Sequence, residues 1–175
     1  GAIKCWFVNF NTTEEVMAAF DFSADDVFKL AEDIEVNGEQ FYRKAAQDVD
    51  DPKNKEMLNN LADMEADHKR LFEQMRAELK EKEKTQTVFD PEGDAENYLK
   101  ALADIRVFFE KPIDTSSMEN ILKAAIQAEK DSIVLYLGMK ELVPEKYGKN
   151  RLENIIKEEM GHIRLLSGEL TKLKK

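Results

Sequence analysis

Two stretches of this sequence decide the fold, EVNGEQFY at residues 35–42 and EADH at residues 65–68, because both recur 94 positions later. They return as EKDSIVLY at residues 129–136 and EMGH at residues 159–162. Each copy keeps a glutamate and a tyrosine seven positions apart, then a glutamate and a histidine three positions apart. The chain has two histidines, and both fall at the same place in the repeat. A repeat of this kind indicates a duplicated structural unit.

Each half of the repeat predicts a pair of long helices. Apolar residues recur at helical spacing, and no segment shows the sustained alternation of a strand. Asp51 and Pro52 are typical of a helix cap and a first helical position, so they predict a turn between the first two helices. The four expected helices span about residues 24–49, 52–84, 117–142 and 150–175. The sequence therefore predicts an all-α fold of two helical hairpins.

The segment between the hairpins is a long crossover. Residues 85–116 contain prolines and a glycine, with a shorter amphipathic helix expected at about residues 95–109. Two hairpins joined by one long crossover is the connectivity of ferritin-like four-helix bundles. We expect residues 23–175 to form such a bundle. Residues 1–22, which include Cys5, are expected to form an N-terminal arm that packs on the bundle or on a second subunit.

The apolar stripes predict which side chains fill the interior. On the second helix the expected inner stripe consists of Leu58, Leu61, Met64, Leu71, Phe72 and Met75. Residues interpreted as ordinary core across the four helices are Phe28, Phe41, Leu71, Leu122, Leu135 and Leu165.

The repeated glutamates and histidines are candidate metal ligands. A glutamate and a histidine at positions i and i+3 share one helix face, and a glutamate 30 positions earlier can lie at the same level after a hairpin turn. One glutamate from each of two helices, with Glu-x-x-His from each of the other two, is a di-metal carboxylate arrangement. Carboxylates with a few imidazoles suit iron or manganese, with zinc as another occupant. The predicted ligands are Glu35, Glu65, His68, Glu129, Glu159 and His162.

The repeat also ranks the rival glutamates. Glu158 lies four positions before His162, but its counterpart in the first half is Met64, so Glu158 is a second choice as a ligand. A single Glu-x-x-His pair on a helix is usually a solvated face, and a duplicated site can lose its metal. Two copies in register that use every histidine favour a metal site.

Tyr42 and Tyr136 are the repeated tyrosines. Each lies two helical turns after a predicted ligand, Glu35 or Glu129, on the same helix face. We interpret both as hydrogen-bond donors that orient a ligand carboxylate and so contribute to the reactive site. The alternative is that they are aromatic core residues.

Composition argues against several classes of function. The formal net charge of −10 argues against a nucleic-acid partner and against binding to anionic lipid. No apolar run approaches membrane-spanning length, so no membrane partner is expected. Cys5 is the only cysteine, which rules out an intrachain disulfide and a zinc-ribbon or rubredoxin module within this sequence and fits a reducing compartment.

The motif Glu-x6-Tyr followed by Glu-x-x-His, present twice, resembles the rubrerythrin branch of the ferritin-like superfamily. The local wording is similar too, with VNGEQFYRKAA at residues 36–46 and MEADH at residues 64–68. The resemblance covers about residues 24–175. It implies that the six predicted ligands bind two irons, with both repeated tyrosines beside them. It also implies reaction with hydrogen peroxide or dioxygen, a cytoplasmic location and a homodimer or larger assembly.

Two features depart from that pattern. Rubrerythrins carry a rubredoxin domain that feeds electrons to the site, so here we expect an external electron donor such as a separate rubredoxin-like protein. Rubrerythrins also have an extra glutamate three residues after the third-helix ligand. That position is Ser132 here, and its counterpart is Gly38, so the site is expected to be more symmetric and less suited to redox-linked ligand exchange.

The sequence therefore favours a di-iron oxidoreductase that reduces peroxide or dioxygen and acts against oxidative stress. Two alternatives remain open at this level. One is ferroxidation with iron storage or buffering, and the other is a bundle with a structural metal or none that acts as a binding module.

Overall fold

The structure is a computed structural model that describes residues 24–79, 114–143 and 145–173. It contains four long helices, α2 (Ala24–Asp48), α3 (Pro52–Ala77), α6 (Met118–Leu142) and α7 (Lys149–Leu173), and a short 3-10 helix, η1 (Glu145–Tyr147). The described residues include no strand. The expected arm at residues 1–22 and the expected short helix at residues 95–109 lie outside the described residues.

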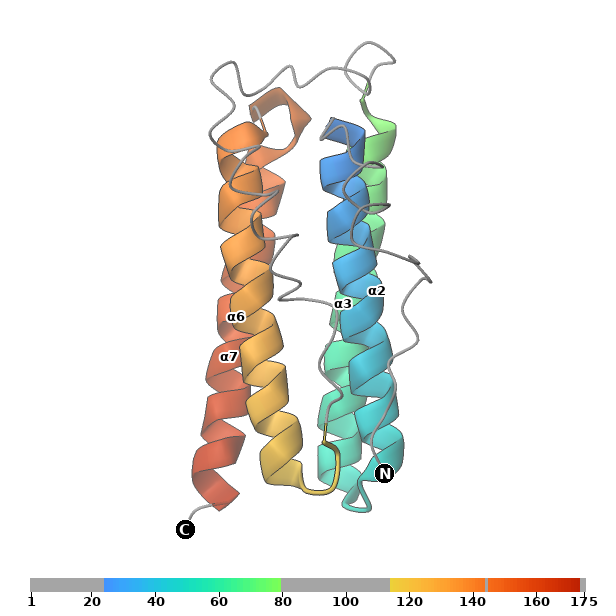
Figure 1. Cartoon of the computed structure of the whole chain (residues 1–175), viewed down its shortest axis with the longest axis vertical. Coiled ribbons are helices and arrows are strands. Elements are labelled where there is room, and N and C mark those ends of the chain that lie inside the picture. Colours follow the sequence, from blue (N-terminus) through green and yellow to red (C-terminus); the bar gives the residue numbers. More distant parts are fainter. Residues whose placement is uncertain (1–23, 80–113, 144, 174–175) are drawn as a thin grey trace, which may run out of the picture.

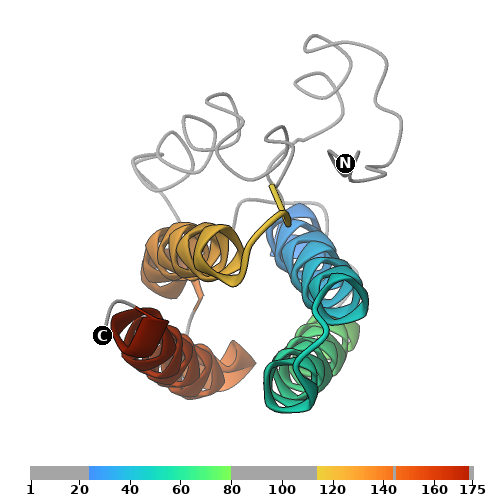
Figure 2. The ribbon, with the colours of Figure 1, turned by 90° about the horizontal axis from the view of Figure 1, so that it is seen from below.

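The four long helices form a bundle of two hairpins, α2 with α3 and α6 with α7, as predicted. Figure 1 shows the helices side by side along the long axis of the molecule. Figure 2 looks along the bundle and shows α2 next to α6, with α3 next to α7. The all-α, ferritin-like bundle expected from the repeat is therefore confirmed. No helix within the described ranges has the length and apolar character that crossing a bilayer requires.

Local capping explains where several helices begin. The Asp51 carboxylate accepts a hydrogen bond from the Asn54 backbone N–H at 2.9 Å, and Pro52 occupies the first turn of α3. The Ser117 hydroxyl oxygen accepts one from the Asn120 backbone N–H at 3.2 Å at the start of α6. Before α7, Gly148 adopts a φ of 105°, a left-handed conformation that favours glycine.

One predicted helix end was wrong, because α3 ends at Ala77 rather than at about residue 84. The backbone N–H of Leu79 bonds to the Arg76 carbonyl at 3.1 Å, which tightens the last turn. Leu79 is buried, and Glu78 forms an ion pair with Arg151 of α7. These tertiary contacts fix the end of α3, whereas the sequence there contains no glycine or proline to signal a stop.

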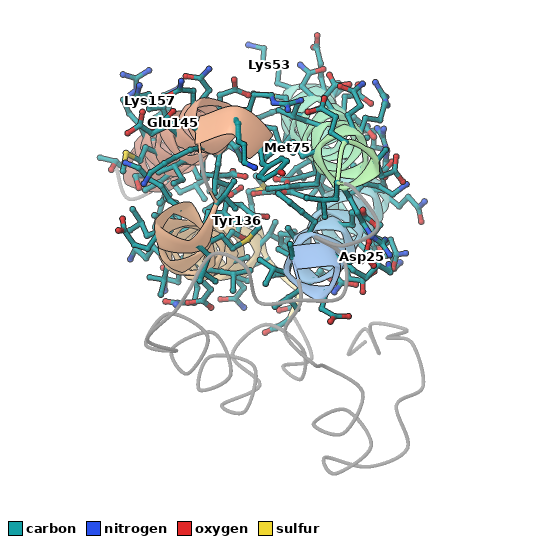
Figure 3. The ribbon with its side chains drawn as sticks, turned by 90° about the horizontal axis from the view of Figure 1, so that it is seen from above. Asp25, Lys53, Met75, Tyr136, Glu145 and Lys157 are labelled. Carbon is teal, nitrogen blue, oxygen red and sulfur yellow. The ribbon has the colours of Figure 1, made fainter. Side chains whose placement is uncertain are left out.

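The buried residues of each helix follow alternating spacings of three and four, as in bundles with near-parallel packing. On α3 this line of inward-facing positions comprises Leu58, Leu61, Glu65, His68, Phe72 and Met75. Figure 3 shows Met75 inside the ring of helices, while Lys53 and Lys157 project outward.

Two predicted core residues are exposed. Met64 is 38% exposed and Leu165 is 44% exposed. Each lies one position away from an inward-facing residue, Glu65 and Leu166 respectively, so the helix rotation turns it outward. Leu71 is partly buried against the core. The other ordinary core predictions are confirmed as buried, namely Phe28, Phe41, Leu122 and Leu135.

The core is divided into two apolar clusters along the bundle axis. One cluster includes Phe28, Phe72 and Met139, and the other includes Leu58, Leu122 and Leu166. On every long helix, the predicted metal ligands lie between the residues of one cluster and those of the other. The ligands therefore occupy a polar layer in the middle of the bundle, with apolar side chains on both sides.

Candidate metal centre

The structure brings all six predicted ligands into this middle layer. The α2 and α6 helices contribute one glutamate each, and α3 and α7 contribute one Glu-x-x-His pair each. Every one of these side chains is buried, with at most 5% of its surface exposed. Glutamate is almost never this buried without a partner, so the layer calls for a compensating charge.

The donor atoms form two overlapping groups. One group consists of Glu35, Glu65, His68 and Glu159, and the other of Glu65, Glu129, Glu159 and His162. Within each group the donor atoms lie within 4.8 Å of one another. Glu65 and Glu159 belong to both groups, so their carboxylates are placed to bridge two ions. The remaining residues divide into one glutamate and one histidine for each ion.

Both imidazole rings turn Nδ1 toward the carboxylates. Nδ1 of His68 is 3.1 Å from Glu159 Oε1 and 3.7 Å from Glu35 Oε2. Nδ1 of His162 is 2.8 Å from Glu159 Oε2 and 3.4 Å from Glu129 Oε1. The two rings stack at a centroid distance of 5.9 Å with 22° between their planes. Nδ1 is therefore the candidate ligand atom of both histidines.

The two repeated tyrosines contact the cluster across the hairpins. The Tyr42 hydroxyl on α2 donates to Glu129 Oε1 on α6, and the Tyr136 hydroxyl on α6 donates to Glu35 Oε1 on α2. Both phenols are buried. The sequence indicated that each tyrosine accompanies a ligand carboxylate, but the carboxylate it reaches belongs to the other half of the repeat.

Glu158 lies outside the ligand cluster. Its Oε2 is 2.9 Å from Nε2 of His68, on the opposite side of the ring from the candidate ligand atom. The side chain of Glu158 is 54% exposed. Sequence reasoning missed this role, because the repeat reveals only residues with a matching counterpart and Glu158 corresponds to Met64.

Several buried donor atoms have no hydrogen-bond partner among residues 24–79, 114–143 and 145–173. They are Glu35 Oε2, His68 Nδ1, both carboxylate oxygens of Glu159, and Nδ1 and Nε2 of His162. A buried polar atom without a partner is costly, so a cluster of them requires an explanation. All except His162 Nε2 belong to the donor groups or face them. Four carboxylates and two imidazoles form a donor set that fits a pair of divalent cations, with iron or manganese favoured.

Comparison with known proteins agrees with this geometry. A family model described as Rubrerythrin matches residues 26–170. The chain belongs to the rubrerythrin family. A solved structure from Thermotoga maritima, assigned as a ferritin-like diiron-carboxylate protein, is similar with a TM-score of 0.63. The match covers 86% of this chain and 95% of that chain at 24% identity, which shows a shared fold. A search of curated proteins found no match.

Protonation balances the charge of this rubrerythrin-family cluster when only side chains are considered. Burial raises the pKa of Glu129 to about 8, although His162 opposes the shift. Burial and Glu35 raise the pKa of Glu65 well above its usual range. Burial would also raise the pKa of Glu159, but its contacts with His162 and His68 outweigh burial and lower it.

Both histidines of the rubrerythrin-family site have raised pKa values. Burial opposes the charged form of each ring, but the neighbouring carboxylates outweigh it. The pKa of His68 rises to about 11 because of Glu159 and Glu35. The pKa of His162 rises to about 9 because of Glu129 and Glu159. Metal binding needs neutral imidazoles and ionised carboxylates, so a cation must displace protons from this cluster.

Two small residues border the site in this rubrerythrin-family chain. A Cβ added to Gly38 would lie 3.2 Å from the carboxyl carbon and Oε2 of Glu65, which is a tight contact. Gly38 thus leaves room for a candidate bridging carboxylate. Its counterpart Ser132 donates its hydroxyl to the Ala128 carbonyl at 3.1 Å, within its own helix. The need for glycine at position 38 was not evident from the sequence.

Proposed function

We propose that this rubrerythrin-family protein binds two iron ions and reduces hydrogen peroxide or dioxygen. The observation that carries the proposal is the pair of overlapping donor groups that share Glu65 and Glu159. Glu35 and His68 would hold one ion, and Glu129 and His162 the other. When bound, two adjacent irons supply two one-electron redox steps at one position.

The side chains around this pair have three tasks. Four glutamates neutralise two divalent cations, which lowers the cost of burying them. Two apolar clusters exclude water from the layers on either side of the ligands. Tyr42 and Tyr136 hold the carboxylates of Glu129 and Glu35 in place. Burial raises the pKa of both phenols well above 10, so they remain protonated donors.

The reaction needs electrons from outside the cluster. Reduction of one hydrogen peroxide molecule to two water molecules consumes two electrons and two protons. The proposal therefore includes an external electron donor, such as a separate rubredoxin-like protein. It also includes a cytoplasmic location and a homodimeric or larger assembly.

Metal content tests the site directly. Protein purified without oxygen and loaded with Fe²⁺ should contain two irons per chain by elemental analysis. Glu65→Gln should reduce this content, because it removes one charge and one bridging oxygen. Glu73→Gln is the matched control, because it removes the same charge from the surface of the same helix, where Glu73 pairs with Lys69. Equal iron content in both variants would contradict the ligand assignment.

Rapid mixing tests the reaction. The diferrous protein should oxidise faster with hydrogen peroxide than with dioxygen, as followed by the visible absorbance of the oxidised centre. Catalytic peroxide consumption should then depend on added reductant. Faster reaction with dioxygen, with many irons oxidised per chain, would favour ferroxidation and storage instead.

A further inference from the structure

The candidate metal centre is nearly symmetric, with one clear exception. Each half supplies a terminal glutamate, a shared glutamate, a histidine and a tyrosine. The exception is the outer nitrogen of the histidines. Nε2 of His68 is 2.9 Å from the Glu158 carboxylate. Nε2 of His162 is buried and finds no hydrogen-bond partner in the described part of the chain.

A carboxylate at the outer nitrogen changes how a histidine binds metal. Its negative charge favours the tautomer with hydrogen on Nε2, which leaves the Nδ1 lone pair free for a cation. The contact also fixes the ring orientation and raises the basicity of the ligand nitrogen. His68 has this support from Glu158 across the two hairpins, since His68 lies on α3 and Glu158 lies on α7.

The repeat explains why His162 lacks the same support. Glu158 precedes His162 by four positions but contacts the histidine of the other hairpin. The equivalent residue for His162 is therefore the one four positions before His68, which is Met64. Met64 is partly exposed, as Glu158 is, but a thioether cannot replace a carboxylate as a hydrogen-bond acceptor of comparable strength.

We propose that Glu158 is a positioning residue that makes the two metal positions unequal. The first divalent cation binds at Glu35 and His68, and the second binds more weakly at Glu129 and His162. This inference rests on the proposed two-metal function and adds an order of loading to it.

Glu158 suits a mutational test because of where it lies. Its side chain is more than half exposed, so its removal leaves no buried charge behind. Glu158→Gln keeps the side-chain shape and removes the charge, while Glu158→Ala removes the acceptor entirely. Thermal unfolding of the metal-free variants, followed by circular dichroism, should match that of the parent and so separate positioning from folding.

The experiment is calorimetric titration with Co²⁺, whose absorbance reports its ligands. His162→Ala keeps the Glu35–His68 position intact, and His68→Ala keeps the Glu129–His162 position intact. We expect Co²⁺ to bind roughly 10–100-fold more tightly to His162→Ala than to His68→Ala, the usual size of such effects. Adding Glu158→Gln should weaken binding in the His162→Ala background and leave the His68→Ala background unchanged.

Met64→Glu provides the complementary gain of affinity. In the His68→Ala background it should strengthen Co²⁺ binding, because it supplies His162 with the missing carboxylate. Met64→Gln is its matched neutral control. No gain from Met64→Glu, or equal weakening of both positions by Glu158→Gln, would overturn the inference.

The parent protein separates failure of this inference from failure of the proposed function. Two phases of Co²⁺ binding that Glu158→Ala merges would support unequal positions. Two ions bound in one phase that Glu158→Ala leaves unchanged would overturn the inference and leave the two-metal function standing. Absence of binding of both Co²⁺ and Fe²⁺ to the parent would overturn the proposed function and the inference together.

Discussion

At the scale of single residues, the tyrosines show how the two halves of the repeat depend on each other. Tyr42 donates to Glu129, and Tyr136 donates to Glu35, so each hairpin orients a candidate ligand carried by the other. Each hydrogen bond is buried, and each glutamate is one of the terminal members of a donor group. The tyrosines can therefore influence a bound ion without touching it.

Replacing either tyrosine by phenylalanine should weaken metal binding and leave the fold intact. Tyr42→Phe keeps the ring in the core but removes the hydrogen bond to Glu129. We expect affinity for Fe²⁺ or Co²⁺ to fall by roughly 10–100-fold, with little change in Tm. Tyr147→Phe, in η1 away from the ligands, should not alter affinity. A large loss of Tm with unchanged affinity would instead identify Tyr42 as an ordinary core residue.

Gly38 should show opposite effects on folding and on metal binding. Gly38→Ala improves helix propensity by roughly 1 kcal/mol, so the metal-free protein should unfold at a higher temperature. The added methyl group presses on the Glu65 carboxylate, so metal affinity should fall. Gly168→Ala on α7 is the control, because a Cβ there meets nothing within 4 Å. It should raise Tm without changing affinity, and unchanged affinity in Gly38→Ala would contradict the tight contact.

At the scale of helices, the sequence was informative wherever a signal was local or repeated. Asp51 and Ser117 are local cap signals, and both form the expected hydrogen bonds. The six ligand candidates were found because a duplicated pattern retained their residue types. Their placement in one buried layer follows from inward-facing positions spaced by three and four along each helix.

Other features of the helices depend on contacts between segments far apart in the sequence. The end of α3 at Ala77 is fixed by burial of Leu79 and by the ion pair between Glu78 and Arg151. The outward rotation of Met64 and Leu165 follows from the inward orientation of neighbouring residues. An apolar residue one position from the inner line looks like core in a stripe, but helix geometry turns it by about 100°.

At the scale of the whole molecule, the cluster should link stability to pH. The pKa values of Glu65, Glu129 and both histidines are raised in the folded protein. Without metal, the folded state therefore holds more protons than the unfolded state from about pH 4.5 to about pH 9. Stability must then fall as pH rises through that window. Glu159, whose pKa is lowered, has the opposite sign, and its contribution is lost below about pH 4.5.

Metal should reverse this trend. Binding displaces protons, so affinity increases with pH, and the gain in Tm from a fixed metal concentration increases with it. Thermal unfolding between about pH 5 and pH 8, with Mn²⁺ and with a chelator, measures both effects. We expect the Tm of the chelated protein to fall across this range and the difference between the two curves to widen. A metal-induced shift in Tm that is constant with pH would contradict the protonation of the cluster.

Each hairpin carries one terminal glutamate, one shared glutamate and one histidine, so two copies of a single hairpin would supply the entire ligand set. A self-associating hairpin would have to keep the same residue at both symmetry-related positions. Fusion of the two copies into one chain removes that restriction. Gly38 then faces Ser132 in the alignment of the halves, and Met64 faces Glu158. Covalent linkage of the hairpins is thus the condition under which selection can assign separate tasks to two positions of common origin.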